Sequence, residues 1–192
     1  MRRVNFDHNA TTALRPQVRA RLAELQATTL GNPSSVHASG RAARALLDEA
    51  RAQAAAALRV REDELAFTSG ATEALHLALH GAHRARGGGV VATSVEHHAV
   101  LGAVRHLAAR GVPTALVPVD QRGRVDPEAV VAATRAVGAG VVAVQLANNE
   151  LGTIQPIAAI RAALRAAGLQ PTPSHVVRFV QKRRRRAAAV CR

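Results

Sequence analysis

The chain has 192 residues, a length that suits one domain with a buried core. Hydrophobic residues make up 48% of the sequence, which excludes a wholly disordered protein, and its single cysteine excludes a disulfide framework or a multi-thiolate metal site. No apolar run approaches the roughly 18 residues that span a membrane, and the N-terminus lacks a secretory signal pattern, so we expect a cytoplasmic protein without a membrane segment. Aromatic residues are only 2%, so the core must be built from Ala, Val and Leu.

The formal net charge of +13 is unevenly distributed. Residues 175–192 contain seven arginines and lysines and no acidic residue, which leaves 19 basic and 13 acidic residues, a charge of +6, for the rest of the chain. The arginine run at 183–186 could bind phosphate backbones non-specifically. No aromatic residues are interleaved with it for base stacking, so we favour a solvated tail and do not expect a nucleic-acid partner.

The predicted elements follow one another in a regular order. After a polar, turn-rich segment at 1–15, two Ala- and Arg-rich helices are expected at 16–25 and 40–58. Apolar strands and helices then alternate, with strands at 64–68, 90–93, 113–119 and 140–146 and helices at 71–86, 97–110, 126–137 and 155–167. This alternation predicts an α/β fold with a mostly parallel sheet and flanking helices.

The end of the chain has a different composition. A turn-rich PTPS stretch is followed by a segment at 175–181 that could form a short strand, and then by a low-complexity basic run. We therefore expect an N-terminal segment over 1–15, one α/β domain over 16–169 and a divergent, disordered basic tail over 170–192.

The first candidate site is the FTSGATEA segment at 67–74, where a strand end, a glycine turn and a helix start are expected in succession. Thr72 would lie in the first helical turn, where backbone N–H groups lack intrahelical partners and the helix dipole is positive. Small residues before it would let a phosphate approach closely. The alternative is an ordinary strand-to-helix turn with Thr72 as its cap.

Two further segments also follow predicted strands. In SVEHHAV, Glu96 and His97 would face the crevice at the carboxyl end of a strand, where open α/β sheets bind ligands. In ANNELGTIQP, Asn148 and Asn149 can hydrogen-bond a bound ring or its substituents. The alternatives are histidines that cap a helix and asparagines that serve a turn.

Three histidines share one face of a predicted helix. His76, His80 and His83 have the spacing i, i+4 and i+7, which would suit zinc, but no glutamate of the HExxH type accompanies them. We favour a solvated or half-buried helix face and expect no metal site.

Taken in order, five segments resemble cysteine desulfurases, pyridoxal-phosphate enzymes of the class V aminotransferase family. They read DHNATT, GNPSSVH, FTSGATEA, VEHHAV and ANNELGTIQP, and the similarity covers about residues 4–169. The resemblance implies the large domain of an aspartate aminotransferase-like, pyridoxal-phosphate-dependent transferase, here incomplete.

The resemblance also implies an activity. Enzymes of this kind remove sulfur from L-cysteine, release alanine and leave a persulfide on an enzyme cysteine, which supplies iron–sulfur cluster or thio-cofactor synthesis. Pyridoxal phosphate would be the cofactor, and the expected partners are a sulfur-acceptor scaffold protein and a second copy in a homodimer. A relative acting on selenocysteine remains open.

Roles for individual residues follow from the same resemblance. Ala71 and Thr72 would hold the cofactor phosphate. His97 would stack on the pyridine ring and assist proton transfer, and Asn149 would hydrogen-bond the phenolic oxygen of that ring. Asn32, in the GNPSS loop, would lie near the substrate carboxylate.

Residues 9–12 would border the entrance to the site. Beyond the helix at 155–167, the family has a strand with an Asp and a Gln, a Ser-Gly-His-Lys stretch with the Schiff-base lysine, a loop with the nucleophilic cysteine, and a substrate-binding arginine. None of these segments is recognisable here, and Lys182 and Cys191 lie in the basic tail.

Three hypotheses follow. The chain is a truncated cysteine desulfurase that is inactive alone, half of a split enzyme, or a basic-tailed nucleic-acid-binding or regulatory remnant. In the family's strand order, the strand at 64–68 would also have no neighbour within this chain.

Overall fold

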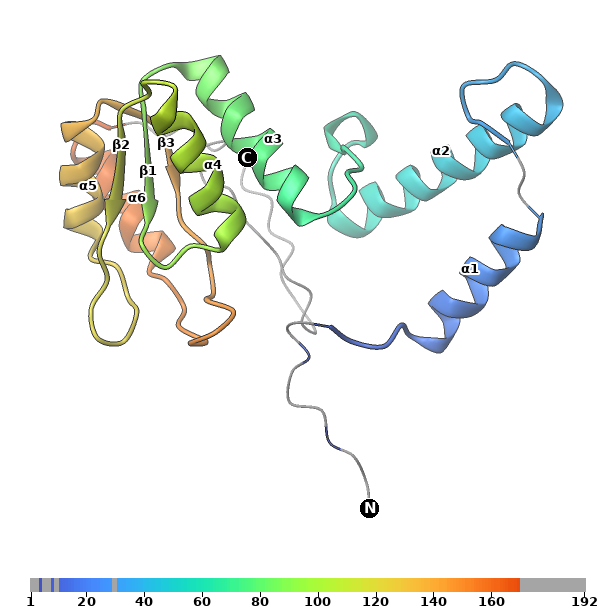
Figure 1. Cartoon of the computed structure of the whole chain (residues 1–192), viewed down its shortest axis with the longest axis horizontal. Coiled ribbons are helices and arrows are strands. Elements are labelled where there is room, and N and C mark those ends of the chain that lie inside the picture. Colours follow the sequence, from blue (N-terminus) through green and yellow to red (C-terminus); the bar gives the residue numbers. More distant parts are fainter. Residues whose placement is uncertain (1–3, 5–7, 9–10, 29–30, 170–192) are drawn as a thin grey trace. The chain divides into compact units, whose positions relative to one another are not determined.

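The computed structural model describes residues 4, 8, 11–28 and 31–169. The chain divides into two compact units, Met1–Ala66 and Phe67–Arg192 (Figure 1). Lys182, Cys191, the strand expected at 175–181 and residues 9 and 10 of the expected entrance loop lie outside the described residues. No helix in the described part is long and apolar enough to cross a membrane.

The first unit contains two helices, α1 (Pro16–Thr28) and α2 (Ala38–Leu58), and a short 3-10 helix, η1 (Glu62–Glu64). Both predicted helices are confirmed, although α1 extends three residues further and α2 begins two residues earlier. Helix α2 begins at Ala38 because the His37 imidazole caps it, accepting a hydrogen bond from the Gly40 amide at 3.3 Å. A Cβ atom at Gly40 would collide with the Ser35 carbonyl, so glycine allows the preceding loop to lie against the helix start.

The strand predicted at 64–68 is not formed. Glu64 ends η1, and residues 65–68 have no regular secondary structure. A strand is stable only when a neighbour pairs its amides and carbonyls, and none of the described strands pairs with this segment. The Leu65 carbonyl instead accepts a hydrogen bond from the Arg51 guanidinium at 2.6 Å.

The second unit is built on three parallel strands in the order β2-β1-β3. The strands are β1 (Gly89–Thr93), β2 (Thr114–Val117) and β3 (Ala139–Ala143), and the helices are α3 (Ala71–Arg86), α4 (His98–Ala109), α5 (Pro127–Ala136) and α6 (Ile157–Ala166). All seven elements lie where the sequence predicts them, with ends that differ by a few residues. The predicted parallel α/β fold is therefore confirmed.

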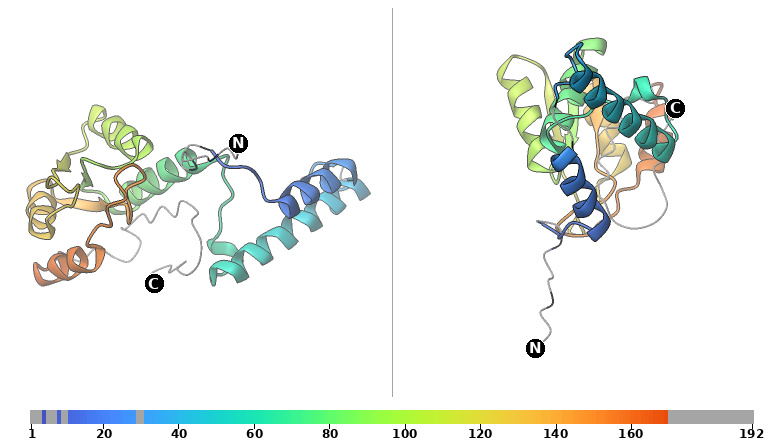
Figure 2. Two further views of the ribbon diagram at one scale, coloured as in Figure 1. Left: turned by 90° about the horizontal axis from the view of Figure 1, so that it is seen from below. Right: turned by 90° about the vertical axis from the view of Figure 1, so that its right-hand side faces the viewer.

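Helices cover both faces of this sheet. Alternate residues of β1 point to opposite faces, as the strand period requires: Val90 and Ala92 pack with α3 and α4, and Val91 packs with α5 and α6. Figure 2 shows the two helical layers from below, with α4 on one side and α5 and α6 on the other. Apart from Ile160, the buried residues of the two clusters are Val, Ala and Leu, as the composition predicts.

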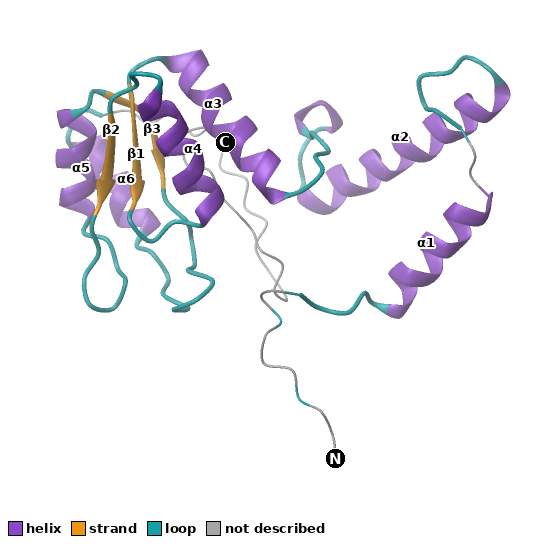
Figure 3. Cartoon of the chain, viewed as in Figure 1, coloured by secondary structure: helices purple, strands orange, loops and turns teal. Residues whose placement is uncertain are grey.

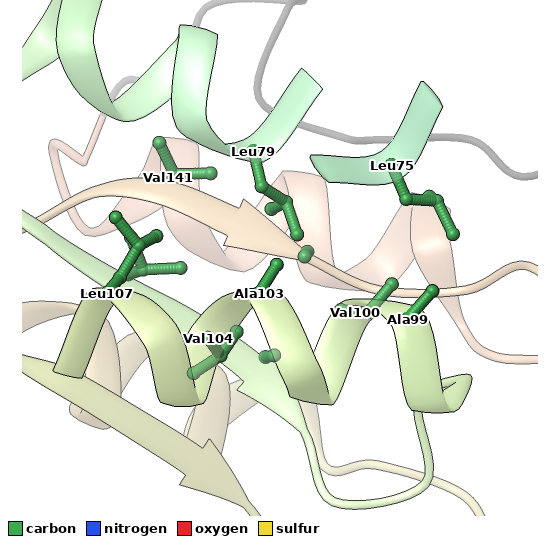
Figure 4. Packing of buried hydrophobic residues seen from close by; sticks show 11 residues of the cluster. Leu75, Leu79, Ala99, Val100, Ala103, Val104, Leu107 and Val141 are labelled. Carbon is green, nitrogen blue, oxygen red and sulfur yellow. The ribbon is translucent and has the colours of Figure 1, made fainter. Parts of the chain in front are cut away.

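Helices α3 and α4 run side by side in the same direction (Figure 4). Leu75 packs near Ala99 and Val100 at the beginning of the pair, and Leu107 packs at its far end. Because both helices run antiparallel to the strands, their N-termini lie at the end of the sheet where the strands finish.

Candidate functional site

The loops that follow the three strands lie together at the carboxyl end of the sheet (Figure 3). This end also carries the N-termini of α3 and α4. The segments 67–74, 94–100 and 147–156, which the sequence singles out separately, are thus brought to one edge. Open α/β sheets bind ligands at this edge.

The N-terminus of α3 is open. Its N-cap is Gly70, which has no side chain to satisfy the first-turn amides, so the predicted alternative of Thr72 as the cap is wrong. Ala71 is half-buried and Thr72 is exposed. Together they place uncapped N–H groups and the positive end of the helix dipole at the surface, which suits an anion.

The Glu73 side chain stabilises the turn that precedes α3 through hydrogen bonds. Its Oε2 accepts hydrogen bonds from the Ser69 amide and the Ser69 hydroxyl, both at 2.6 Å. These bonds stabilise the ionised carboxylate and lower the pKa of Glu73. The carboxylate points back to Ser69. It therefore stabilises the turn that contains Gly70, the N-cap of α3.

Glu96 joins the ends of two strands. The side chain is buried, and its Oε1 accepts hydrogen bonds from the Thr93 hydroxyl at 2.7 Å and from the Gln145 amide at 2.9 Å. Burial raises the pKa of Glu96 despite these two bonds. The expectation that Glu96 faces the crevice is wrong, because its carboxylate is buried and connects β1 with the segment that follows β3.

His97 follows directly and is the N-cap of α4. Its Nδ1 accepts a hydrogen bond from the Ala99 amide at 3.1 Å, so the alternative of a capping histidine is confirmed for this residue. In the neutral imidazole this bond assigns the proton to Nε2. The half-buried ring is therefore oriented by the helix it caps, and its centroid lies 6.0 Å from that of His98.

Asn148 organises the loop after β3. Its Nδ2 donates to the Val95 carbonyl at 3.0 Å, and its Oδ1 accepts from the amides of Glu150 at 2.9 Å and Leu151 at 2.8 Å. The turn alternative is therefore confirmed for Asn148. Asn149 is half-buried and follows it immediately, so this turn places Asn149 at the same edge as His97.

Two glutamines contribute contacts that sequence reasoning missed. The Gln145 side chain also donates to the Val95 carbonyl, beside Asn148. Gln155 accepts from the Val125 amide at 3.0 Å and donates to the Gly123 carbonyl at 2.6 Å, which joins the loops after β2 and β3. In the sequence, each of these glutamines is a polar residue within an apolar segment. That pattern was the available signal, because buried polar side chains are almost always hydrogen-bonded.

Asn32 and Thr12 belong to the first unit of the chain. Asn32 is exposed, and its Oδ1 accepts a hydrogen bond from the Ser34 amide at 2.9 Å. The Thr12 hydroxyl lies 3.1 Å from Nδ1 of His8. The substrate-binding role of Asn32 and the entrance role of residues 9–12 stay predictions.

The three histidines of α3, His76, His80 and His83, are half-buried. This agrees with the interpretation of their spacing as a half-buried helix face. Among the described residues, no group of three or more His, Cys, Asp or Glu side chains is arranged to hold a metal ion.

Comparison with known proteins identifies the family. The aminotransferase class-V model matches residues 4–170. A protein named putative cysteine desulfurase IscS 1, from Bacillus subtilis strain 168, is 42% identical over 160 residues, which are 82% of this chain and 42% of that protein. Cysteine desulfurase IscS from Dictyoglomus turgidum is 39% identical over 159 residues, which are 81% of this chain and 40% of that protein.

Solved structures agree with this assignment. A structure titled NifS-like protein superposes with a TM-score of 0.79 and 31% identity, covering 94% of this chain and 50% of that one. The chain thus spans about half of that solved protein, and about two fifths of the curated relatives. Pyridoxal phosphate is the cofactor of these proteins. The chain belongs to the aminotransferase class-V family, with cysteine desulfurases as its relatives.

Proposed function

We propose that this chain carries the phosphate- and ring-binding part of a pyridoxal-phosphate site of cysteine desulfurase type. One observation carries the proposal: the start of α3, the segment after β1 and the segment after β3 meet at the carboxyl end of one parallel sheet. When bound, pyridoxal phosphate supplies an electron sink for the carbanion chemistry of an amino-acid substrate.

The residues present fit the phosphate of this cofactor. Gly70 leaves the N-terminus of α3 without a side-chain cap, and a Cβ atom there would meet nothing within 4 Å, so the approach is open. The amides of Ala71 and Thr72 would donate to phosphate oxygens, helped by the helix dipole. Glu73 would hold the turn in place through Ser69.

His97 and Asn149 would receive the ring. The Ala99 amide fixes the orientation of the His97 imidazole, so the ring can stack on an aromatic cofactor without reorganising. Its Nε2 would hold or move a proton beside the substrate. The Asn148 turn positions Asn149, whose amide would donate to the phenolic oxygen of the cofactor.

L-cysteine is the substrate that we propose for the complete site. This proposal is supported by the names of the relatives and by a solved structure titled SspA in complex with cysteine, which is 27% identical with a TM-score of 0.72. Asn32 would bind the substrate carboxylate. From the resemblance of the sequence motifs to cysteine desulfurases, we also propose that sulfur would pass to an acceptor scaffold for iron–sulfur cluster assembly, in the cytoplasm and in a homodimer.

We further propose that this chain alone binds the cofactor without turning over cysteine. No lysine occurs among the described residues, and the single lysine of the sequence, Lys182, lies outside them. The covalent link between cofactor and protein needs a lysine amine in a desolvated pocket. A separate chain carrying that lysine would complete the site, which is the split-enzyme alternative.

The binding proposal is tested by titrating the full chain with pyridoxal phosphate and, as a matched ligand, pyridoxal. We expect pyridoxal phosphate to bind at least about tenfold more tightly, because only it has a dianion for the start of α3. Asn149→Ala should weaken both ligands, since both have the phenolic oxygen. Equal affinities for the two ligands, or no binding of either, would contradict the proposal.

The proposed inactivity has its own measurement. The chain is incubated with pyridoxal phosphate and L-cysteine, and alanine is quantified against a protein-free reaction. We expect no alanine above that background, from wild type or from Lys182→Ala. Alanine formed by wild type and abolished by Lys182→Ala would show that the single lysine serves catalysis after all.

A further inference from the structure

A pocket of about 630 Å³ lies between α3 and α4, away from the candidate site. Its lining residues, called here the α3–α4 basic pocket, are His80, His83, Arg84, His106, Leu107, Arg110 and Val112. They come from the second half of α3, the last turn of α4 and the turn after it. The candidate cofactor site lies at the N-termini of the same helices, so the two places are at opposite ends of the pair.

The pocket has positive groups and no acidic partner. None of the ion pairs in the described part of the chain involves Arg84 or Arg110, and no carboxylate lines the pocket. Two guanidinium groups therefore share a concave surface with three imidazoles. An arrangement of this kind attracts an anion and offers forked donors to its oxygens.

The imidazoles are close together, and one buried imidazole nitrogen lacks a hydrogen-bond partner in the described part of the chain. The His80 ring lies 5.3 Å from the His106 ring, edge to face, and 5.8 Å from the His76 ring, measured between centroids. Nδ1 of His83 is buried and has no hydrogen-bond partner among the described residues. A buried nitrogen without a partner is costly, and a small ring rotation toward a bound oxygen would relieve it.

We propose that the α3–α4 basic pocket binds a small oxyanion of the phosphate type, a site separate from that of the cofactor. Arg84 would hold it from α3 and Arg110 from the end of α4. The imidazoles of His80, His83 and His106 would donate to the remaining oxygens once protonated. A tetrahedral oxyanion suits this donor set better than a single carboxylate, because the donors come from two helices and outnumber two oxygens.

Protonation couples to this binding. Burial lowers the pKa of His80, with the charges of His106, His76, His83 and Arg110 acting in the same direction. These groups face His80 from both helices of the pair. An oxyanion in the pocket would offset their mutual repulsion, so it would raise the pKa of His80. The affinity for sulfate, which stays doubly charged between about pH 8 and pH 6, should therefore rise as the pH falls over that range.

A simpler explanation exists for each cation taken singly. His83, Arg84 and His106 lie in last turns, where positive side chains complement the negative end of the helix dipole. That explanation predicts stabilisation of the helices without any ligand. It predicts neither convergence on one pocket nor a response to phosphate, so the two accounts can be separated.

The test is a titration of the full chain with inorganic phosphate, observed through the histidine-ring NMR signals at about pH 6.5 and constant ionic strength. Signals are assigned with single His→Gln variants. We expect the rings of His80, His83 and His106 to shift together and saturate, while that of His37 in the first unit does not. Scattered, non-saturating shifts, or shifts confined to His175 in the tail, would overturn the proposal.

Matched variants identify the donors. Arg84→Gln and Arg110→Gln should each weaken phosphate binding roughly tenfold, the loss expected for one charged hydrogen-bonding group. Arg105→Gln on the exposed face of α4 removes the same charge outside the pocket and should have little effect. Equal weakening by all three would show only a general charge effect and reject the site.

A variant that fails to fold would also lose phosphate binding, so the folding of each variant must be checked. Each variant is first compared with wild type by circular dichroism. If the arginine variants unfold, Arg84→Lys and Arg110→Lys keep the charge but lose the fork, and they should bind phosphate more weakly than wild type and more tightly at low than at high ionic strength. Unchanged affinity in folded lysine variants would contradict bidentate binding.

Discussion

Glu96 is the residue on which the geometry of the candidate site depends most. Its buried carboxylate accepts from Thr93 at the end of β1 and from Gln145 after β3. These two contacts set the spacing between the segments that carry His97 and Asn149. A carboxylate in this position is costly when ionised, and the raised pKa of Glu96 records that cost.

The variant Glu96→Gln tests this role through its pH dependence. A raised pKa in the folded state means that the native protein binds more protons than the unfolded chain. The stability that this provides is complete below the unfolded pKa and is lost as pH rises through the folded one. Gln keeps the acceptor oxygen but does not titrate, so the stability of the variant relative to wild type should increase with pH above about 4.5.

Glu73→Gln is the contrasting control. Wild type and both variants are unfolded with denaturant at a series of pH values, and their free energies of unfolding are compared. Hydrogen bonds from Ser69 lower the pKa of Glu73, so its contribution is present above the unfolded pKa and is lost as pH falls through the folded one. The two variants should therefore change relative stability in opposite directions with pH. Parallel curves would show that Glu96 is not held as the structure describes.

Asn148 and Asn149 are neighbours with different proposed tasks. Asn148→Ala removes an acceptor from two amides and a donor from the Val95 carbonyl, so we expect a loss of about 1–3 kcal/mol in the free energy of unfolding. Asn149→Ala should cost less stability but reduce affinity for pyridoxal phosphate. Chemical denaturation and cofactor titration of both variants test these two roles. A larger loss of stability in Asn149→Ala and a larger loss of cofactor affinity in Asn148→Ala would contradict the assignment.

The start of α5 is an element-level feature that can be read from the sequence, because an Asp-Pro pair is typical of a capped helix start. Asp126 caps helix α5, which starts at Pro127, and its carboxylate accepts a hydrogen bond from the Glu128 amide at 3.2 Å. Asp126→Ala should cost about 1 kcal/mol in the free energy of unfolding, the usual value for a lost N-cap. Gln121→Ala, at an exposed position in the same loop, is the control and should change stability little.

The elements of the second unit were predictable because their pattern is local. Apolar runs such as 140–146 and capped starts such as Asp126 are visible without any knowledge of the tertiary structure. The segment at 64–68 has an equally apolar run, but a strand needs a partner, and pairing is not encoded locally. The prediction therefore failed where formation depends on a neighbouring strand.

The candidate site was predictable only in part for the same reason. Motif order pointed to Thr72, His97 and Asn149, and the topology brings their segments to one edge of the sheet. The supporting contacts of Glu96 and Gln145 connect residues 49 positions apart. Such contacts depend on the order β2-β1-β3, which periodicity does not determine.

At the scale of the whole molecule, two separate regions of the chain concentrate positively charged residues. One is the basic tail, with seven arginines and lysines in residues 175–192. The other is the α3–α4 basic pocket, where Arg84 and Arg110 meet three histidines. The cofactor site depends on neither, because its proposed attraction for phosphate comes from the backbone at the start of α3.

The most direct measurement of the central claim is histidine-ring NMR during titration of the full chain with pyridoxal phosphate. We predict that the His97 ring signals shift and saturate with the binding curve, and that Asn149→Ala moves the curve to higher ligand concentration. The rings of His80, His83 and His106 should follow a separate curve that inorganic phosphate reproduces. A saturating pyridoxal phosphate complex that leaves His97 unshifted would contradict the assignment of the cofactor site.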